Sequence, residues 1–218
     1  MQELTQLKES PSQTAGPYVH IGCVPNFCDI TGVYPEDLGA RMVNAETKGE
    51  RITVKGTIYD GTGTPLKDAL VEIWQVDNNG VYIHTEARDR EKRDGNFQGF
   101  GRFLTNSKGE YYFRTIKPVQ YGPRTSHIHL AVKQGSKRML TTQIYTQGDP
   151  RNTRDRILNS VTDAAARDLL IAEYKPLAGS RTGELAVNFD VVIGVTPQDP
   201  KQDQGRSVPR RRGAARQQ

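Results

Sequence analysis

The chain contains little cysteine, histidine or tryptophan, and it lacks long apolar runs. In 218 residues there are 2 cysteines, 4 histidines and 1 tryptophan. No run of about 18 consecutive apolar residues occurs, which excludes a transmembrane helix. Residues 1–5 have neither the basic region nor the apolar core of a signal peptide, so we expect a cytoplasmic protein with no membrane partner.

The scarcity of cysteine limits the sites that thiols could form. Cys23 and Cys28 are separated by four residues, and a structural zinc site would need two more ligands at a matching spacing. Only His20 lies near them in the sequence. Because a disulfide is not expected in a chain without an export signal, we expect two reduced thiols.

An excess of one charge sign is confined to the end of the chain. The net charge is +5, and residues 201–218 hold six basic residues and one acidic residue. The rest of the chain therefore holds 24 residues of each sign. A basic tail can contact nucleic acid or anionic surfaces, but no nucleic-acid-binding motif precedes it. We expect residues 199–218 to be a disordered tail, with no nucleic-acid partner.

Turn-forming residues, in contrast, are abundant: there are 21 glycines and 12 prolines. Between the turns lie short stretches in which apolar and polar residues alternate, the pattern of half-buried strands. These stretches are residues 52–59, 69–76, 99–104, 110–116, 126–132, 139–145 and 184–193. They predict an all-β fold, an antiparallel β-sandwich or barrel over residues 51–198 with short helical connections at 149–157 and 162–167. Residues 1–50 are expected to form an irregular N-terminal arm that packs on this core.

Two of the histidines flank a single isoleucine in the stretch 126–132. On a strand, residues two apart lie on the same face, so the side chains of His127 and His129 would point the same way, opposite the apolar face. Two neutral imidazoles in this arrangement suit a metal ion. The alternative is a half-exposed strand whose polar face happens to carry two histidines.

The choice of metal depends on the remaining ligands. A zinc site of three histidines would need another imidazole, and only His20 and His84 remain. Tyrosine is plentiful, with 9 residues, among them Tyr82 and, shortly before the histidine pair, Tyr121. Phenolate is a hard anionic donor that suits Fe(III) better than Zn(II). Two phenolates and two imidazoles would leave Fe(III) with one positive charge, a reasonable balance for accepting a dianionic substrate.

Several blocks of the chain are specific in their joint order and spacing, although any one block alone would not be. The blocks are Pro11–Gly22, Val71–Gln75, Gly80–Tyr82, Phe97–Arg102, Phe113–Pro118, Arg124–His129 and Thr142–Tyr145. Taken together, they resemble the intradiol ring-cleaving dioxygenases of the protocatechuate 3,4-dioxygenase type. The resemblance covers residues from about 11 to about 195.

The resemblance implies a non-haem enzyme with one Fe(III) per active site. It would convert protocatechuate to 3-carboxy-cis,cis-muconate and incorporate both atoms of O2. Tyr121 would be the axial tyrosinate that leaves when substrate arrives. The implied iron ligands are Tyr82, Tyr121, His127 and His129.

The same resemblance assigns residues around the substrate. Arg124 would supply a fixed positive charge where negative charge grows on the ring. The implied set comprises the polar pair Arg124 and Gln143, the wall residue Trp74, and the substrate contacts Thr14, Pro17 and Tyr18. The block 14–18 resembles part of the family's non-catalytic subunit, yet here it shares a chain with the iron ligands. We therefore expect one gene product that forms a homo-oligomer; alternatively, the block only packs against the body.

The chain departs from the family pattern in one place, where only residues 122–126 lie between Tyr121 and His127. A more open pocket mouth is expected, so hydroxyquinol, catechol or a bulkier catechol are alternative substrates. Because the first strand begins near Arg51, we expect no helical dimerisation region like that of the catechol- and hydroxyquinol-cleaving relatives, which favours protocatechuate. Two further hypotheses are a transthyretin-like β-sandwich that only binds ligands, and a zinc hydrolase.

Overall fold

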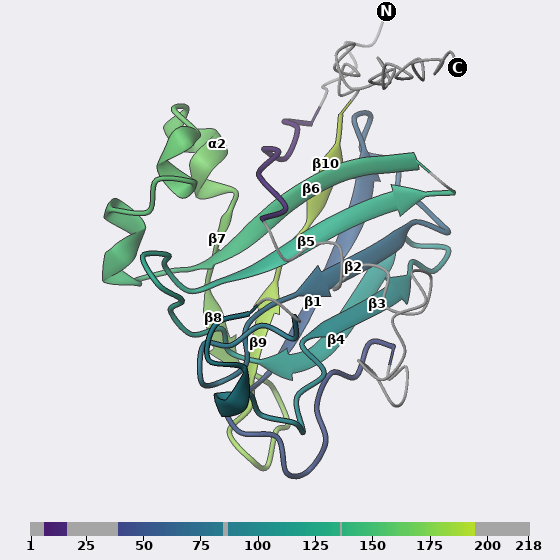
Figure 1. Cartoon of the computed structure of the whole chain (residues 1–218). Helices are drawn as coiled ribbons and strands as arrows, with labels where there is room; N and C mark the ends of the chain where they lie inside the picture. Colours follow the sequence, from purple (N-terminus) through teal and green to yellow (C-terminus); the bar gives the residue numbers. More distant parts are fainter. Residues whose placement is uncertain (1–6, 17–38, 85–86, 136, 195–218) are drawn as a thin grey trace, which may run out of the picture.

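The computed structural model describes residues 7–16, 39–84, 87–135 and 137–194 (Figure 1). Two of the predicted substrate contacts, Pro17 and Tyr18, lie outside the described residues, as do both cysteines, His20 and the tail 199–218. Within the described part, no helix is long and apolar enough to cross a membrane.

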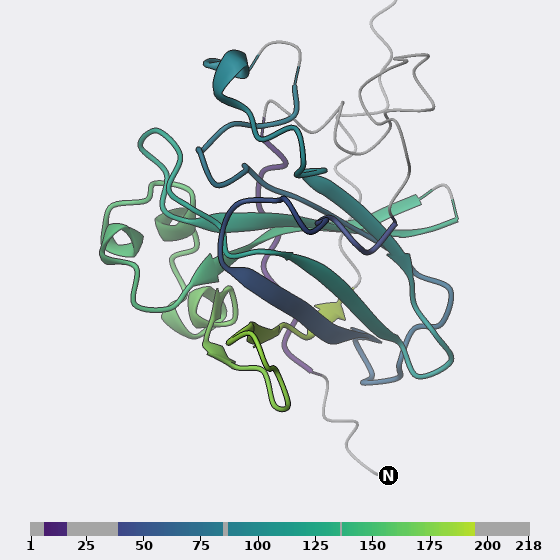
Figure 2. The same cartoon turned by 90° about the horizontal axis from the view of Figure 1, so that it is seen from below.

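The described residues form ten strands in two five-stranded sheets (Figures 1 and 2). The first sheet has the order β10-β1-β9-β8, with β4 also paired to β1, and the second has the order β3-β2-β5-β6-β7. The strands are β1 (Arg51–Asp60), β2 (Leu70–Trp74), β3 (Phe100–Leu104), β4 (Glu110–Ile116), β5 (His127–Gln134), β6 (Lys137–Thr146), β7 (Ile171–Ala172), β8 (Tyr174–Pro176), β9 (Leu185–Asn188) and β10 (Val191–Ile193).

Short helical segments connect some of these strands. One 3-10 turn precedes β3, and two more follow β6 together with a single short α-helix. They are η1 (Arg90–Lys92), η2 (Pro150–Thr153), η3 (Leu158–Ser160) and α2 (Ala164–Asp168). Asp149 and Asp163 begin η2 and α2 by accepting backbone N–H groups with their carboxylates, as N-cap residues do.

The predicted all-β sandwich is confirmed, but its sheets are mixed, whereas purely antiparallel sheets were expected. β1 pairs in parallel with β9 and β10, and β6 pairs in parallel with β7. β9 and β10 follow one register along β1, interrupted at Phe189 and Asp190. Opposite the interruption lies Gly56, where an added Cβ would clash with the Phe189 carbonyl oxygen. Only glycine lets the two backbones approach this closely.

Side chains from both sheets meet in one hydrophobic core. β5 supplies Ile128, Leu130 and Val132 to it, as the alternation of the sequence predicts. The other face of β5 is buried as well, because His127 and His129 are each only 3% exposed. The strand is therefore covered on both faces, not half-exposed.

On the face of the second sheet that carries the histidines, the strand register aligns side chains of β2, β5 and β6 in rows. Trp74 of β2 pairs with His129 of β5, and His129 pairs with Gln143 of β6. These three residues therefore lie side by side across three strands, and His127 pairs with Tyr145 one step along. The candidate site lies on this face of the sheet.

The described part of the N-terminal segment, residues 7–16, runs along both sheets (Figure 1). The backbone N–H of Ser10 donates to the Val192 carbonyl of β10, and the N–H of Gln13 donates to the Thr141 carbonyl of β6. The segment ends beside the face of β5 that carries the histidines, where a Cβ on Gly16 would lie 3.4 Å from Cε1 of His129.

Candidate metal centre

β5 directs both histidines of the pair toward one point. Their Nε2 atoms are 3.3 Å apart. The Nδ1 atom of His127 lies 2.7 Å from the Thr125 carbonyl oxygen, which can only accept a hydrogen bond. This contact fixes the tautomer with the proton on Nδ1 and leaves the Nε2 lone pair of His127 free for a metal.

His129 is held by stacking rather than by hydrogen bonds to its outer nitrogen. The Trp74 indole lies parallel to the imidazole, with ring centroids 4.9 Å apart and an interplanar angle of 3°. Nε2 of His129 lies 3.1 Å from the Tyr82 hydroxyl, while its buried Nδ1 has no partner among the described residues. The imidazole is thus oriented toward Tyr82 and His127.

A tight turn after β2 places Tyr82 at the site. The carboxylate of Asp77 accepts hydrogen bonds from the N–H groups of Asn79 and Val81, at 2.8 and 2.9 Å. Gly80 adopts a φ of 77°, which a residue with a side chain adopts only at a cost. The sequence Asp77-Asn-Asn-Gly80 therefore supplies both the carboxylate and the glycine that the turn requires.

Tyr121 approaches Tyr82 from another turn. Its ring lies edge-on to the Tyr82 ring, with centroids 5.3 Å apart. The N–H of Arg124 donates to the Tyr121 carbonyl at 2.9 Å, which closes a two-residue turn through Gly122 (φ 52°) and Pro123. The short connection noted in the sequence is therefore a hairpin turn that presents Tyr121 and Arg124 together.

Both histidines are neutral at physiological pH. Burial, reinforced by the positive charge of Arg124, lowers the pKa of His127 to about 4. Burial also holds the pKa of His129 well below its ordinary value, with His127 and Arg124 acting in the same direction. Neutral imidazole is the form that binds metal ions, so the protein environment already favours it.

Arg124 is the cation beside this centre, and its guanidinium is held from two sides. Nε donates to the Asp155 carboxylate at 2.7 Å, and Nη2 donates to the Gln143 side-chain oxygen at 2.7 Å. Nη2 also lies 3.2 Å from the Tyr145 hydroxyl. The structure thus brings Arg124 and Gln143 together, and it adds Asp155 and Tyr145, which were not among the predicted site residues.

The N-terminal segment meets the same network. Gln143 donates through Nε2 to the Thr14 carbonyl at 2.8 Å, and the Tyr145 hydroxyl donates to the Gln13 side chain. The Thr14 hydroxyl accepts from the N–H of Gly16 at 3.2 Å. Thr14 therefore contacts the site through its backbone. Gln13 was not among the predicted site residues either, although it lies within the block Pro11–Gly22.

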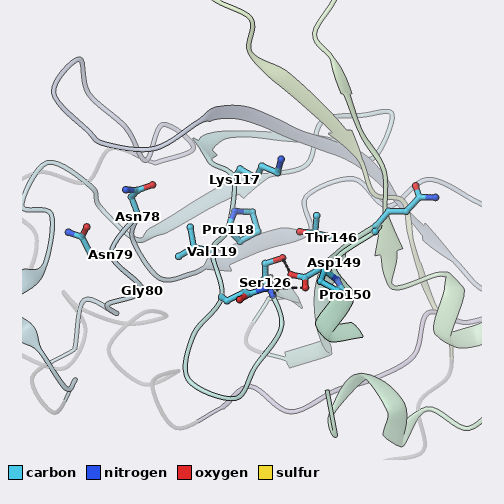
Figure 3. A pocket seen from close by; sticks show the side chains of 13 residues that line it. Asn78, Asn79, Gly80, Lys117, Pro118, Val119, Ser126, Thr146, Asp149 and Pro150 are labelled. Atoms are coloured by element: carbon cyan, nitrogen blue, oxygen red, sulfur yellow. Dashed lines mark hydrogen bonds between the residues drawn. The ribbon is translucent and has the colours of Figure 1, made fainter. Parts of the chain in front are cut away.

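A groove of about 680 Å³ lies next to the turn that carries Tyr121 (Figure 3). It is lined by residues 78–80, 117–120 and 146–150 together with Ser126, whose hydroxyl donates to Asp149. None of the predicted site residues lines it. Over the described ranges, no three residues among His, Cys, Asp and Glu gather in the way that a zinc site would require.

Comparison with known proteins assigns the chain to a family. A family profile described as "Dioxygenase" matches residues 24–194. The chain is 38% identical over 173 residues to the protocatechuate 3,4-dioxygenase beta chain of Burkholderia cepacia, covering 74% of this chain and 72% of that one. It is 31% identical over 195 residues to the protocatechuate 3,4-dioxygenase alpha chain of Pseudomonas putida, covering 86% and 92%.

A solved structure agrees with this assignment. The dioxygenase domain of a dioxygenase–carbohydrate-binding protein fusion from Streptomyces sp. SirexAA-E matches with a TM-score of 0.63 and 28% identity, covering 87% of this chain and 100% of that one. The chain belongs to the intradiol ring-cleavage dioxygenase family. It is an enzyme, an intradiol dioxygenase, and the hypothesis of a transthyretin-like module that only binds ligands is wrong.

The ion pair between Arg124 and Asp155 leads to a pH-dependent prediction. Burial favours the neutral acid, but hydrogen bonds from Arg124 and from two backbone N–H groups outweigh it and hold the pKa of Asp155 below its ordinary value. The unfolded chain therefore binds a proton on this carboxyl more readily than the folded protein does. The stabilisation by Asp155 should be complete above about pH 5 and should be lost progressively as the pH falls through the unfolded-state pKa toward the lowered folded-state pKa.

Thermal unfolding of the wild type and of Asp155→Asn at pH 7 and at pH 3 tests this expectation. At pH 7 the wild type should unfold at a clearly higher temperature than Asp155→Asn. This difference in unfolding temperature should be smaller at pH 3, where the carboxyl becomes protonated in the unfolded state. An equal gap at both pH values would contradict it.

Proposed function

We propose that Tyr82, Tyr121, His127 and His129 hold one Fe(III) ion, with which the enzyme cleaves catechols between the two hydroxylated carbons. The observation that carries the proposal is the convergence of two imidazole nitrogens and a phenol oxygen. The Nε2 atoms are 3.3 Å apart, and the Tyr82 hydroxyl is 3.1 Å from one of them. Phenolate and imidazole together form a donor set suited to ferric iron.

The second nitrogen of each histidine supports the fit. His127 donates Nδ1–H to a carbonyl, an arrangement that is usual for metal-bound imidazoles. His129 turns its Nε2 inward although its buried Nδ1 then finds no partner among the described residues. An unpaired buried nitrogen is costly, and a metal bond at Nε2 would offset that cost.

The protein's own groups would bind, orient and move protons around the substrate. Fe(III), when bound, would withdraw electron density from the catechol ring and so make the ring reactive toward O2. Tyr121, one of the residues that would hold the ion, would accept one catechol proton on its phenolate oxygen as the substrate binds. Arg124, held by Gln143 and Asp155, would stabilise negative charge that grows on the ring. Trp74 would keep His129 in place by stacking.

We further propose protocatechuate as the substrate and a homo-oligomer as the assembly. Two of the similar proteins are the beta and alpha chains of protocatechuate 3,4-dioxygenases. In this chain the N-terminal segment and the ligand-bearing strand meet within one polypeptide, since Thr14 bonds Gln143 and Gly16 lies against His129. One gene product would thus supply both parts of the pocket.

Oxygen uptake by the iron-loaded protein tests the proposal. Protocatechuate, catechol, hydroxyquinol and a bulkier catechol are compared, and the products are identified by mass spectrometry and NMR. We expect the highest kcat/KM with protocatechuate, and 3-carboxy-cis,cis-muconate as the product. A faster reaction with another catechol would refute the substrate alone. Absence of uptake with every catechol, or cleavage outside the diol, would refute the function.

A further inference from the structure

The three residues before His127 are all held by the loop that contains η2 and η3. Asp155 accepts hydrogen bonds from Nε of Arg124 at 2.7 Å and from the N–H of Thr125 at 3.0 Å. Asn152 accepts from the Thr125 hydroxyl at 2.8 Å. Asp149 accepts from the hydroxyl of Ser126 at 2.7 Å. This loop therefore fixes the segment from which the first histidine of the site extends.

Asp155 is itself rigidly held. The residue is 1% exposed, and its second carboxylate oxygen accepts the N–H groups of Ile157 and Leu158 at 3.0 and 2.9 Å. With two donors on each oxygen, the carboxylate has used its full accepting capacity. Its position is thus set by the backbone of the loop, and it can transmit that position to Arg124.

The Arg124 guanidinium is a planar fork whose two edges meet different partners. Nε contacts Asp155, and Nη2 contacts Gln143 and the Tyr145 hydroxyl. The Gln143 side chain in turn donates to the N-terminal segment. Because both edges are held, the plane of the guanidinium has one orientation. A lysine could supply the same charge but could not form this fork.

We propose that Asp155 is a positioning residue that acts through Arg124: its carboxylate sets the direction in which the guanidinium faces the substrate. The inference rests on the proposed function, since Arg124 has a catalytic role only if a catechol binds at the histidine pair.

A double-mutant cycle on the iron-loaded enzyme tests the proposal. The variants Asp155→Asn, Arg124→Gln and their combination are compared by kcat and by KM. Asp155→Asn should lower kcat by about 10–100-fold, the usual effect of removing an outer-shell partner, with a smaller change in KM. In the Arg124→Gln background the same substitution should lower kcat by less than about threefold, because the group through which it acts is gone. Equal factors in both backgrounds would overturn the proposal.

Two controls separate positioning from general stability. Asp163 is exposed, begins α2 and pairs with Lys8, so Asp163→Asn should leave kcat unchanged. Arg124→Lys keeps the positive charge and leaves Asp155 in place. It should have a kcat close to that of Arg124→Gln, whereas a wild-type kcat would overturn the proposal. This variant decides the matter even if Asp155→Asn fails to fold.

An NMR measurement on the iron-free protein is independent of turnover. The Nε–H proton of Arg124 should exchange slowly with water in the wild type and rapidly in Asp155→Asn. A wild type that is inactive with every catechol but protects this proton would refute the proposed function alone. An active wild type whose Nε–H exchanges as fast in the presence of Asp155 as in its absence would overturn the positioning role alone.

Discussion

Replacing His129 with alanine should yield a folded protein that no longer binds Fe(III) at one ion per chain and has no measurable ring-cleaving activity. The imidazole brings Nε2 to within 3.3 Å of the other histidine and 3.1 Å of the Tyr82 hydroxyl. Without this imidazole, a metal ion would lose the ligand that lies between His127 and Tyr82. The loss of metal affinity and of activity should exceed the roughly 10–100-fold loss that follows removal of an outer-shell partner.

The measurement is iron content after dialysis together with oxygen uptake, and His84→Ala is the matched control. His84 is another histidine and lies just after Tyr82, but it is not one of the proposed ligands. We expect the control to retain iron and activity. Retention of both by His129→Ala, or their loss in His84→Ala, would contradict the assigned ligand set.

Gly16→Val should have the second large effect, although Gly16 contributes no side chain. A Cβ at this position would lie 3.4 Å from Cε1 and 3.8 Å from Nε2 of His129. The further methyl groups of valine would extend into the space in front of the imidazole, where a metal or a substrate would have to lie. We expect a loss of at least about tenfold in kcat/KM, comparable with the disturbance of outer-shell partners.

The control for this substitution is Gly179→Val. The two glycines have nearly equal φ values, 76° and 77°, so the backbone strain of adding a side chain is matched. A Cβ at Gly179 meets nothing within 4 Å. Steady-state kinetics with both variants should show a loss only for Gly16→Val. An equal loss of kcat/KM in both variants would show that backbone strain causes the effect. No loss in either variant would contradict the placement of the N-terminal segment beside the site.

The sequence predicted those parts of the site that depend on local periodicity. A period of two places His127 and His129 on one face, and the turn residues Asp77 and Gly80 mark the end of the strand before Tyr82. The fold class was also predictable, because alternating stretches separated by turns occur along most of the chain. Each of these features depends only on neighbours within a few residues.

Features that depend on distant partners could not be predicted from the sequence. Asp155 lies in a stretch that was expected only to be helical, and its bond to Arg124 joins residues 31 positions apart. The strands β7 and β8 are 2 and 3 residues long, too short to show alternation, and they owe their strand conformation to pairing with β6 and β9. The parallel pairing of β1 with β9 joins residues more than a hundred positions apart, for which no local pattern exists.

The most direct test of the ferric site is the visible and resonance Raman spectrum of the protein loaded with Fe(III). Tyrosinate bound to Fe(III) gives a broad visible charge-transfer band, and excitation in that band enhances the ring vibrations of the bound tyrosinates. We predict a burgundy protein with tyrosinate vibrations, whose intensity falls in Tyr82→Phe and in Tyr121→Phe. A colourless protein after iron loading, or a band unchanged by both substitutions, would contradict a site formed by these tyrosines and the histidine pair.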